Sequence, residues 1–388
     1  MKSTKYDPEV MDLQTKDGVA LQLRRYKKEE VPSDMPPVLL LHGASAASLT
    51  FEIGAEQPLV DYLIERGRDV WALDWRASNR YDFTDSPTGH RLDFTLDQVS
   101  DYDIPAALTA MRDTTKKQTV DVLAHCLGGA AMAQAVARRT VTNLGSVILS
   151  AMGLFYTVPV AGMLKALDGV LERLLENGGW RLAPNDWTQV PLVEDLYKAF
   201  PTFAKPHPAA RMDPLHRLKG LKLSRGPRQY LSPDEYCNRL AFMFGECYLC
   251  KPIGDIHRQT AEQFGYMYVP MYLHGTQNIR RGHAARFSPP GDTKQPESYL
   301  QPAPFAALPR LTLLTGNENR LWHRDSIDNM YEWLLNSGVG RPGSDASQVC
   351  DLEKHVLLGF GHQDLLWGDT SKELVFPLIE GRLTPGGG

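Results

Sequence analysis

Residues 121–131 read Asp-Val-Leu-Ala-His-Cys-Leu-Gly-Gly-Ala-Ala, and this stretch decides the fold. The run before Cys126 is apolar and is typical of a buried strand, while the small residues after it open a helical pattern. A single residue on a tight turn between a strand and a closely packed helix is the geometry of a nucleophile elbow. The usual motif is G-x-S-x-G, and here Ala124 stands for the first Gly and Cys126 for the Ser. The alternative is a small core cysteine in an ordinary strand–helix turn.

The turn also predicts the chemistry of Cys126. A thiol at a helix N-terminus meets the positive end of the helix dipole and free N–H groups, which favour a thiolate. The backbone N–H of Leu127 is expected to point at the same place, where it can bind an oxyanion.

The composition is that of an ordinary globular protein. The 388 residues carry a net charge of −4 with acids and bases mixed, so nothing indicates nucleic acid or an anionic membrane as a partner. The N-terminus has no apolar signal segment, and no apolar run is long enough to span a bilayer. Five cysteines without a disulfide-framework spacing indicate free thiols and a cytoplasmic location.

Strand and helix patterns alternate along both ends of the chain. A hairpin is expected over 10–26, buried strands over 38–41, 69–74, 144–150 and 311–315, and a last strand within 349–358, with helices over 59–66 and 95–114 between them. This alternation predicts an α/β fold with a mostly parallel central sheet and helices on both faces. Residues 153–308 show helical patterns instead. We therefore expect a core formed by 1–152 and 309–388 and a large helical cap over 153–308.

Three loops after strands carry the remaining candidate residues. The run 38–41 ends in His42-Gly43, and the N–H of Ala44 is the candidate for a second oxyanion donor. His362 follows the last strand and is the candidate base for Cys126. The order nucleophile, orienting residue, histidine is that of the α/β-hydrolase fold.

The orienting residue is open between two neighbours. The usual Asp of G-x-x-D is Asn319 here, whose amide oxygen can still accept the imidazole N–H, as in Cys-His-Asn enzymes. Glu318 is the second candidate for this role, and Asn319 can alternatively do no more than cap a turn.

Motifs along most of the chain resemble the cysteine-containing α/β hydrolases that are fused to, or encoded beside, cholesterol-oxidase-like GMC oxidoreductases. The resemblance implies Cys126, Asn319 and His362 as triad positions and a GMC-type oxidoreductase as a partner. More distantly, the elbow is similar to that of polyhydroxyalkanoate synthases, and the closing loop to that of acid lipases. The motifs are His42-Gly43, Asp74-Trp75-Arg76, Ala124-His125-Cys126-Leu127-Gly128, Tyr236-Cys237-Asn238-Arg239-Leu240, Gly316-Asn317-Glu318-Asn319 and Gly359-Phe360-Gly361-His362-Gln363-Asp364.

The remaining cysteines allow two interpretations, a zinc site or core cysteines. Cys247 and Cys250 form a C-x-x-C with Cys237 and His257 nearby, but the stretch is apolar and helical in pattern. We therefore expect core cysteines, no metal and no cofactor.

These observations predict an enzyme with a Cys-His-Asn(Glu) triad. Cys126 would attack an ester, thioester, lactone or activated C–C bond of an apolar, lipid- or steroid-like substrate and form an acyl-enzyme. One alternative is an acyltransferase or cyclase that passes the acyl group to an organic acceptor. Another is a non-catalytic binding module on a hydrolase fold. The sequence predicts no oligomeric state.

Overall fold

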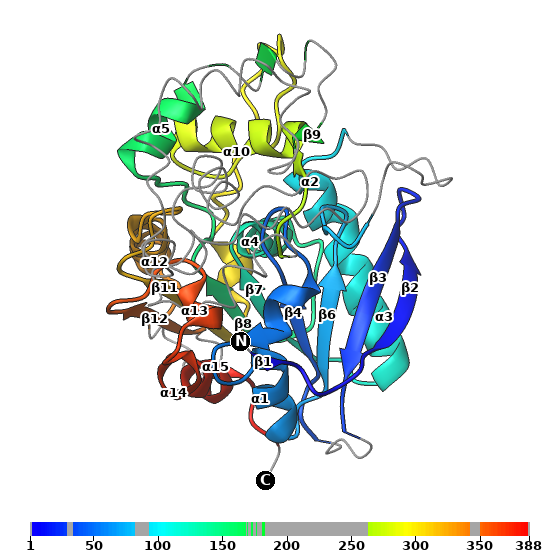
Figure 1. The fold of residues 1–388 in the computed structure, drawn as a ribbon. Helices are drawn as coiled ribbons and strands as arrows, with labels where there is room; N and C mark the ends of the chain where they lie inside the picture. Colours follow the sequence, from blue (N-terminus) through cyan, green and yellow to red (C-terminus); the bar gives the residue numbers. More distant parts are fainter. Residues whose placement is uncertain are drawn as a thin grey trace, which may run out of the picture.

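An eight-stranded sheet forms the centre of the fold in the computed structural model of the protein (Figure 1). The structure describes residues 2–28, 34–81, 93–167, 263–341 and 350–386, with a few isolated residues between 169 and 182. The strand order is β12-β11-β8-β7-β4-β6-β3-β2. The strands are β2 (Glu9–Gln14), β3 (Ala20–Tyr26), β4 (Val38–Leu41), β6 (Val70–Asp74), β7 (Val120–His125), β8 (Leu144–Ser150), β11 (Arg310–Gly316) and β12 (Asp351–Leu357).

The sheet is parallel from β6 to β12, and only β2 and β3 run antiparallel to their neighbours. The predicted hairpin over 10–26 and the predicted parallel strands are therefore confirmed. The strand over 38–41 has the predicted bounds, because a continuous apolar run between a Pro-rich loop and His42-Gly43 leaves little choice of register.

Alternate side chains of the parallel strands enter two separate hydrophobic cores. Leu39 and Leu41 of β4 pack in one core, and Val38 and Leu40 pack in the other. This follows from the two-residue period of a strand whose two faces are both covered.

Helices cover both faces, as predicted. The first core contains α3 (Ile104–Thr115), α4 (Leu127–Ala137) and α12 (Asp325–Asn336), and the second contains α1 (Leu59–Glu65) and α15 (Phe376–Arg382). Shorter elements complete the described chain: β1 (Lys2–Ser3), η1 (Ser48–Phe51), β5 (Ile53–Gly54), β9 (Arg181–Leu182), β10 (Met267–Tyr268), α11 (Ala303–Ala306), α13 (Asp364–Trp367) and α14 (Ser371–Leu374).

The predicted single helix over 95–114 is interrupted. It consists of α2 (Leu96–Gln98), a π-helical turn η2 (Val99–Asp103) and α3. Pro105 has no N–H to donate to the preceding turn, and the wider π turn lies directly before it. Thr95 and Gln98 form a capping box that fixes the beginning of this segment.

Part of the predicted cap region is described. Helices α5 (Val160–Leu167) and α10 (Val269–Arg281) lie together above the sheet in Figure 1. Met271 of α10 packs in the same core as α4, and the hydroxyl of Tyr299 donates to Asp97 at 2.5 Å. The rest of the region, including the helical pattern over 234–250, lies outside the described residues, so the cap over 153–308 stays a prediction. None of the helices described here is long and apolar enough to cross a membrane.

Candidate active site

Cys126 lies on a strained turn between β7 and α4. Its backbone has φ 56° and ψ −131°, a combination that non-glycine residues rarely adopt. The turn is held from both sides, because the Cys126 N–H donates to Ser150 O at 2.9 Å and the Ala130 N–H donates to Cys126 O at 3.1 Å. The predicted strand, turn and helix are therefore present.

Three glycines allow backbones to approach this turn. A Cβ at Gly128 would lie 2.4 Å from His42 O, and one at Gly129 would lie 2.7 Å from Met152 O. A Cβ at Gly43 would lie 2.8 Å from Cys126 Cβ and 3.3 Å from its Sγ. Small residues are thus required on both sides of the nucleophile candidate for steric reasons.

Two backbone N–H groups and one indole surround the sulfur. The N–H groups of Leu127 and Ala44 lie near enough to the Cys126 thiol to lower its pKa. The Trp322 side chain also lowers it, although Trp322 Nε1 lies outside strict hydrogen-bonding geometry. Burial acts more strongly in the opposite direction and raises the pKa of the thiol to about 11.

The N–H groups act in the expected direction, but burial outweighs them. Only 6% of Cys126 is exposed, and loss of water around a charged sulfur outweighs the favourable N–H groups. The thiol is neutral near pH 7 in this structure.

The loop that carries Ala44 is organised by the Asp74-Trp75 pair. The Trp75 indole donates to His42 O at 3.1 Å and stacks on the His42 ring at 5.1 Å between centroids. The Asp74 carboxylate accepts from the Ser48 N–H at 2.8 Å. These bonds hold the Ala44 N–H in position from the neighbouring strand.

His362 lies next to the nucleophile turn but forms no hydrogen bond there. Its ring is 4.7 Å from that of His125, the residue before Cys126, and only 1% of it is exposed. Neither ring nitrogen has a partner among the described residues. Burial, and then His125, hold the pKa of His362 well below its ordinary value of 6.5. The imidazole is therefore neutral.

The loop after β11 lies against the loop that carries His362. A Cβ at Gly316 would lie 2.1 Å from Phe360 O, and Asn317 Oδ1 accepts from the Gly359 N–H at 2.6 Å. The topology thus brings together two loops that follow neighbouring strands.

The two candidate orienting residues differ in their surroundings. The Asn319 side chain is buried, and its Oδ1 accepts from the N–H groups of Leu321 and Trp322, both at 3.1 Å, while Nδ2 has no partner in the described part of the chain. The Glu318 carboxylate accepts from Asn317 Nδ2 at 3.1 Å, and 44% of its side chain is exposed. The structure thus has neither side chain hydrogen-bonded to His362.

Sequence reasoning missed two contacts of the site. The approach of Trp322 to the thiol was not predicted, and His125 was quoted only as part of a motif. Neither contact has a local signal, because each joins segments about 200 residues apart in the chain.

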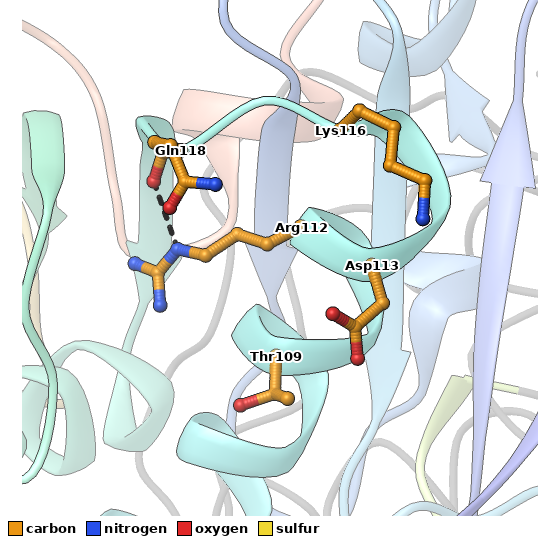
Figure 2. A pocket seen from close by; sticks show the side chains of 5 residues that line it. All are labelled: Thr109, Arg112, Asp113, Lys116 and Gln118. Atoms are coloured by element: carbon orange, nitrogen blue, oxygen red, sulfur yellow. Dashed lines mark hydrogen bonds between the residues drawn. The ribbon is translucent and has the colours of Figure 1, made fainter.

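A surface hollow of about 280 Å³ lies away from these residues (Figure 2). It is lined by Thr109, Arg112, Asp113, Lys116 and Gln118, and the Arg112 side chain donates to Gln118 O at 2.9 Å. Gln118 precedes β7 whereas Cys126 follows it, so about 20 Å of strand separates the hollow from the thiol.

The possible zinc ligands Cys237, Cys247, Cys250 and His257 lie outside the described residues. Among those described, no three His, Cys, Asp or Glu side chains are grouped closely enough to hold a metal ion.

Comparison with known proteins agrees with this architecture. Residues 36–224 match the family profile described as the alpha/beta hydrolase fold. Two solved structures each cover 97% of this chain and are themselves covered to 99%. They are DcsB in complex with its substrate analogue, with a TM-score of 0.52 at 14% identity, and a carboxyl esterase from Bacillus coagulans, with a TM-score of 0.55 at 13% identity. At these identities the likeness concerns the fold.

Curated relatives match shorter segments. Sterol esterase 2 of Saccharomyces cerevisiae is 27% identical over 31% of this chain and 24% of its own length. The poly(3-hydroxyalkanoate) polymerase subunit PhaC of Haloarcula marismortui is 25% identical over 35% of this chain and 28% of its own. Lipase lipl-1 of Caenorhabditis elegans is 25% identical over 47% of this chain and 49% of its own. The matches thus span a quarter to a half of these relatives.

The parallel sheet, the strained turn between β7 and α4, and the match over residues 36–224 together show that the chain has the alpha/beta hydrolase fold.

Proposed function

We propose that the chain is an acyl hydrolase that works through a thioester on Cys126. The bond attacked would be an ester, thioester, lactone or activated C–C bond of an apolar, lipid- or steroid-like substrate. The main support is that the N–H groups of Ala44 and Leu127, from two different loops, both lie near enough to one sulfur on a strained turn to lower its pKa. Ester hydrolases among the similar proteins, Sterol esterase 2 and lipase lipl-1, add support for acyl chemistry.

In the proposed mechanism His362 acts as a general base. As Cys126 Sγ attacks the acyl carbon, the thiol proton passes to the imidazole, and the carbonyl oxygen becomes an oxyanion held by the N–H groups of Ala44 and Leu127. Collapse of this intermediate expels the alkoxide or thiolate, or the stabilised carbanion of an activated C–C bond, which takes the proton from His362. Water then attacks the thioester by the same route and releases the acid.

A neutral thiol and a neutral imidazole suit this order of events, because the proton moves during attack and no ion pair has to exist beforehand. The bond between His362 and the thiol would form when substrate binds, since catalytic hydrogen bonds often tighten only in the complex.

We propose Asn319 as the residue that orients His362, with Glu318 as the alternative. Asn319 is the more buried of the two, and its role would be to accept the N–H of His362 through Oδ1. The variant Asn319→Asp keeps an acceptor for Leu321 and Trp322 and should retain activity. Asn319→Ala should lose about 1–2 kcal/mol of stability and most of the activity. If Glu318→Gln abolishes turnover while Asn319→Ala does not, the assignment is reversed.

Acyl transfer is the second candidate function. The cysteine in place of serine and the similarity to a poly(3-hydroxyalkanoate) polymerase subunit favour an acyl-enzyme that persists until an organic acceptor binds.

A GMC-type oxidoreductase is the partner proposed from the family resemblance, and it would supply or modify the apolar substrate.

Intact-mass spectrometry with a panel of activated acyl esters and thioesters tests the proposal. We expect one acyl adduct on Cys126, absent from Cys126→Ala and slower to form in His362→Ala. Cys350 is a matched control, because it is also a buried thiol, with a pKa raised to about 12, but lies outside the elbow. An adduct on Cys350, or none on Cys126 across the panel, would contradict the proposal. Release of free acid in water would favour hydrolysis, and release only with an added alcohol or amine would favour transfer.

A further inference from the structure

The imidazole of His362 lies beside the nucleophile turn without a hydrogen bond to hold it there. Both ring nitrogens lack a partner among the described residues, and the residue is 1% exposed. Neither candidate orienting side chain, Asn319 or Glu318, is bonded to the ring. The position of the ring therefore depends on the loop that carries it.

The loop after β11 holds the first part of this loop. The N–H of Gly359 donates to Asn317 Oδ1 at 2.6 Å, and the N–H of Glu318 donates to Phe360 O at 3.0 Å. These two bonds fix the backbone up to two residues before His362. The backbone next to the histidine needs a further support.

Asp364 closes the loop across His362 itself. Its Oδ2 accepts the N–H of Gly361 at 2.8 Å, so this bond spans the histidine. A carboxylate that reaches back three residues to a backbone N–H repeats one half of a capping box. Asp364 is 3% exposed, and a hydrogen bond between a carboxylate and an N–H is stronger than one between neutral groups.

The Asp364 carboxylate is itself on a fixed support. Asp364 is the first residue of α13, and its carbonyl accepts from the Ser371 hydroxyl at 2.5 Å. The Trp367 indole at the end of α13 donates to Thr50 O at 2.9 Å, which joins residues 317 positions apart. The carboxylate is therefore anchored to the rest of the core independently of His362.

We infer that Asp364 is the positioning residue of His362. By holding the Gly361 N–H it fixes the backbone that carries the imidazole, and the proposed bond from Asn319 to the ring would add to this support. The inference deepens the proposed function and rests on the role of His362 as base for Cys126. Misplacing a catalytic group by about 1 Å costs about 100-fold in rate, so the loss of one loop bond is measurable.

Alkylation of Cys126 by iodoacetamide reports on His362 without an acyl substrate. The sulfur displaces iodide and the thiol proton passes to the imidazole, so the rate depends on the same base. With the whole chain at pH 7, His362→Ala should slow the reaction about 100-fold, as followed by mass spectrometry of the Cys126 peptide. Asp364→Ala should slow it about tenfold or more. Asp364→Asn keeps an oxygen for the Gly361 N–H and should stay within about threefold of the wild type.

A double variant separates positioning from a structural role. In His362→Ala/Asp364→Ala the second change should slow alkylation by less than about twofold, because the base that it positions is gone. Asp121→Ala is the matched control. The Asp121 carboxylate is also buried and accepts the Ser146 N–H at 2.7 Å, but it lies near the start of β7, whereas Cys126 follows the end of that strand. This variant should lower Tm and leave the alkylation rate unchanged.

Three results would overturn the inference. They are a wild-type rate in Asp364→Ala, the same loss from Asp364→Ala with and without His362, and equal losses in Asp364→Ala and Asp364→Asn. If Asp364→Ala does not fold, Asp364→Leu takes its place, because leucine fills a similar branched volume without an acceptor and should show the same loss.

Failure of the proposed function gives a different pattern. If no ester or thioester acylates Cys126 but alkylation depends on His362 and Asp364 as stated, the proposed function fails and the positioning role stands. If His362→Ala is alkylated as fast as the wild type, His362 is not a base for this sulfur and the inference is refuted.

Discussion

Replacing Cys126 by glycine should make the protein more stable than replacing it by alanine. Both variants lose the thiol, but alanine keeps a Cβ at φ 56° and ψ −131°, where the backbone is strained. Strain of this kind costs about 1–3 kcal/mol, and glycine removes it. Glycine also loses about 0.5–1 kcal/mol through the greater freedom of its unfolded chain. The net advantage of Cys126→Gly over Cys126→Ala is therefore about 0.5–2 kcal/mol.

The assay is thermal and urea unfolding of the two variants side by side. For 388 residues, an unfolding entropy of about 2.1 cal/mol/K per residue converts the difference to about 0.6–2.5 °C in Tm. Ala106→Gly is the control, because Ala106 lies within α3, where glycine should cost about 1 kcal/mol. If Cys126→Gly unfolds below Cys126→Ala by as much as the control does, the turn carries no strain and the nucleophile elbow is refuted.

Two further predictions follow from the packing and burial of the site. Gly43→Ala should lower kcat about tenfold with the fold retained, because its Cβ would lie 2.8 Å from Cys126 Cβ. Gly275→Ala is the control and should leave kcat unchanged, because its Cβ would meet nothing within 4 Å. Equal kcat values for the two variants would contradict the close approach at Gly43. The pKa values of three buried histidines are lowered by burial, to about 4 for His42, about 3 for His125 and well below 6.5 for His362. As the pH drops below about 6.5, the unfolded chain binds protons at these histidines before the folded chain does, so the free energy of unfolding should fall. The expected loss at pH 5 is about 2 kcal/mol per histidine. Equal free energies of unfolding in urea at pH 7 and pH 5 would contradict this prediction.

Local sequence determined the framework of this protein. The apolar runs over 38–41 and 144–150, the strand pattern over 10–26 and the small residues after Cys126 each carry their own backbone preference and burial, so the strands, the hairpin and the turn were predictable. The chain order of the three loops was enough to expect them at one edge of a parallel sheet. The π turn before Pro105 was not predicted, because helical spacing does not distinguish a regular helix from one widened at a single turn.

Only the tertiary structure decided the state of the site. Whether Cys126 is a thiolate depends on how completely neighbouring loops exclude water, and 6% exposure makes it a neutral thiol. The side-chain oxygen of Asn319 accepts hydrogen bonds from two N–H groups of its own loop, and the position of Asn319 in a motif does not reveal these bonds. The Trp367 indole that anchors α13 donates to Thr50 O although 317 positions separate the two residues. Burial and convergence of this kind arise from contacts between distant segments, so no local pattern in the chain encodes them.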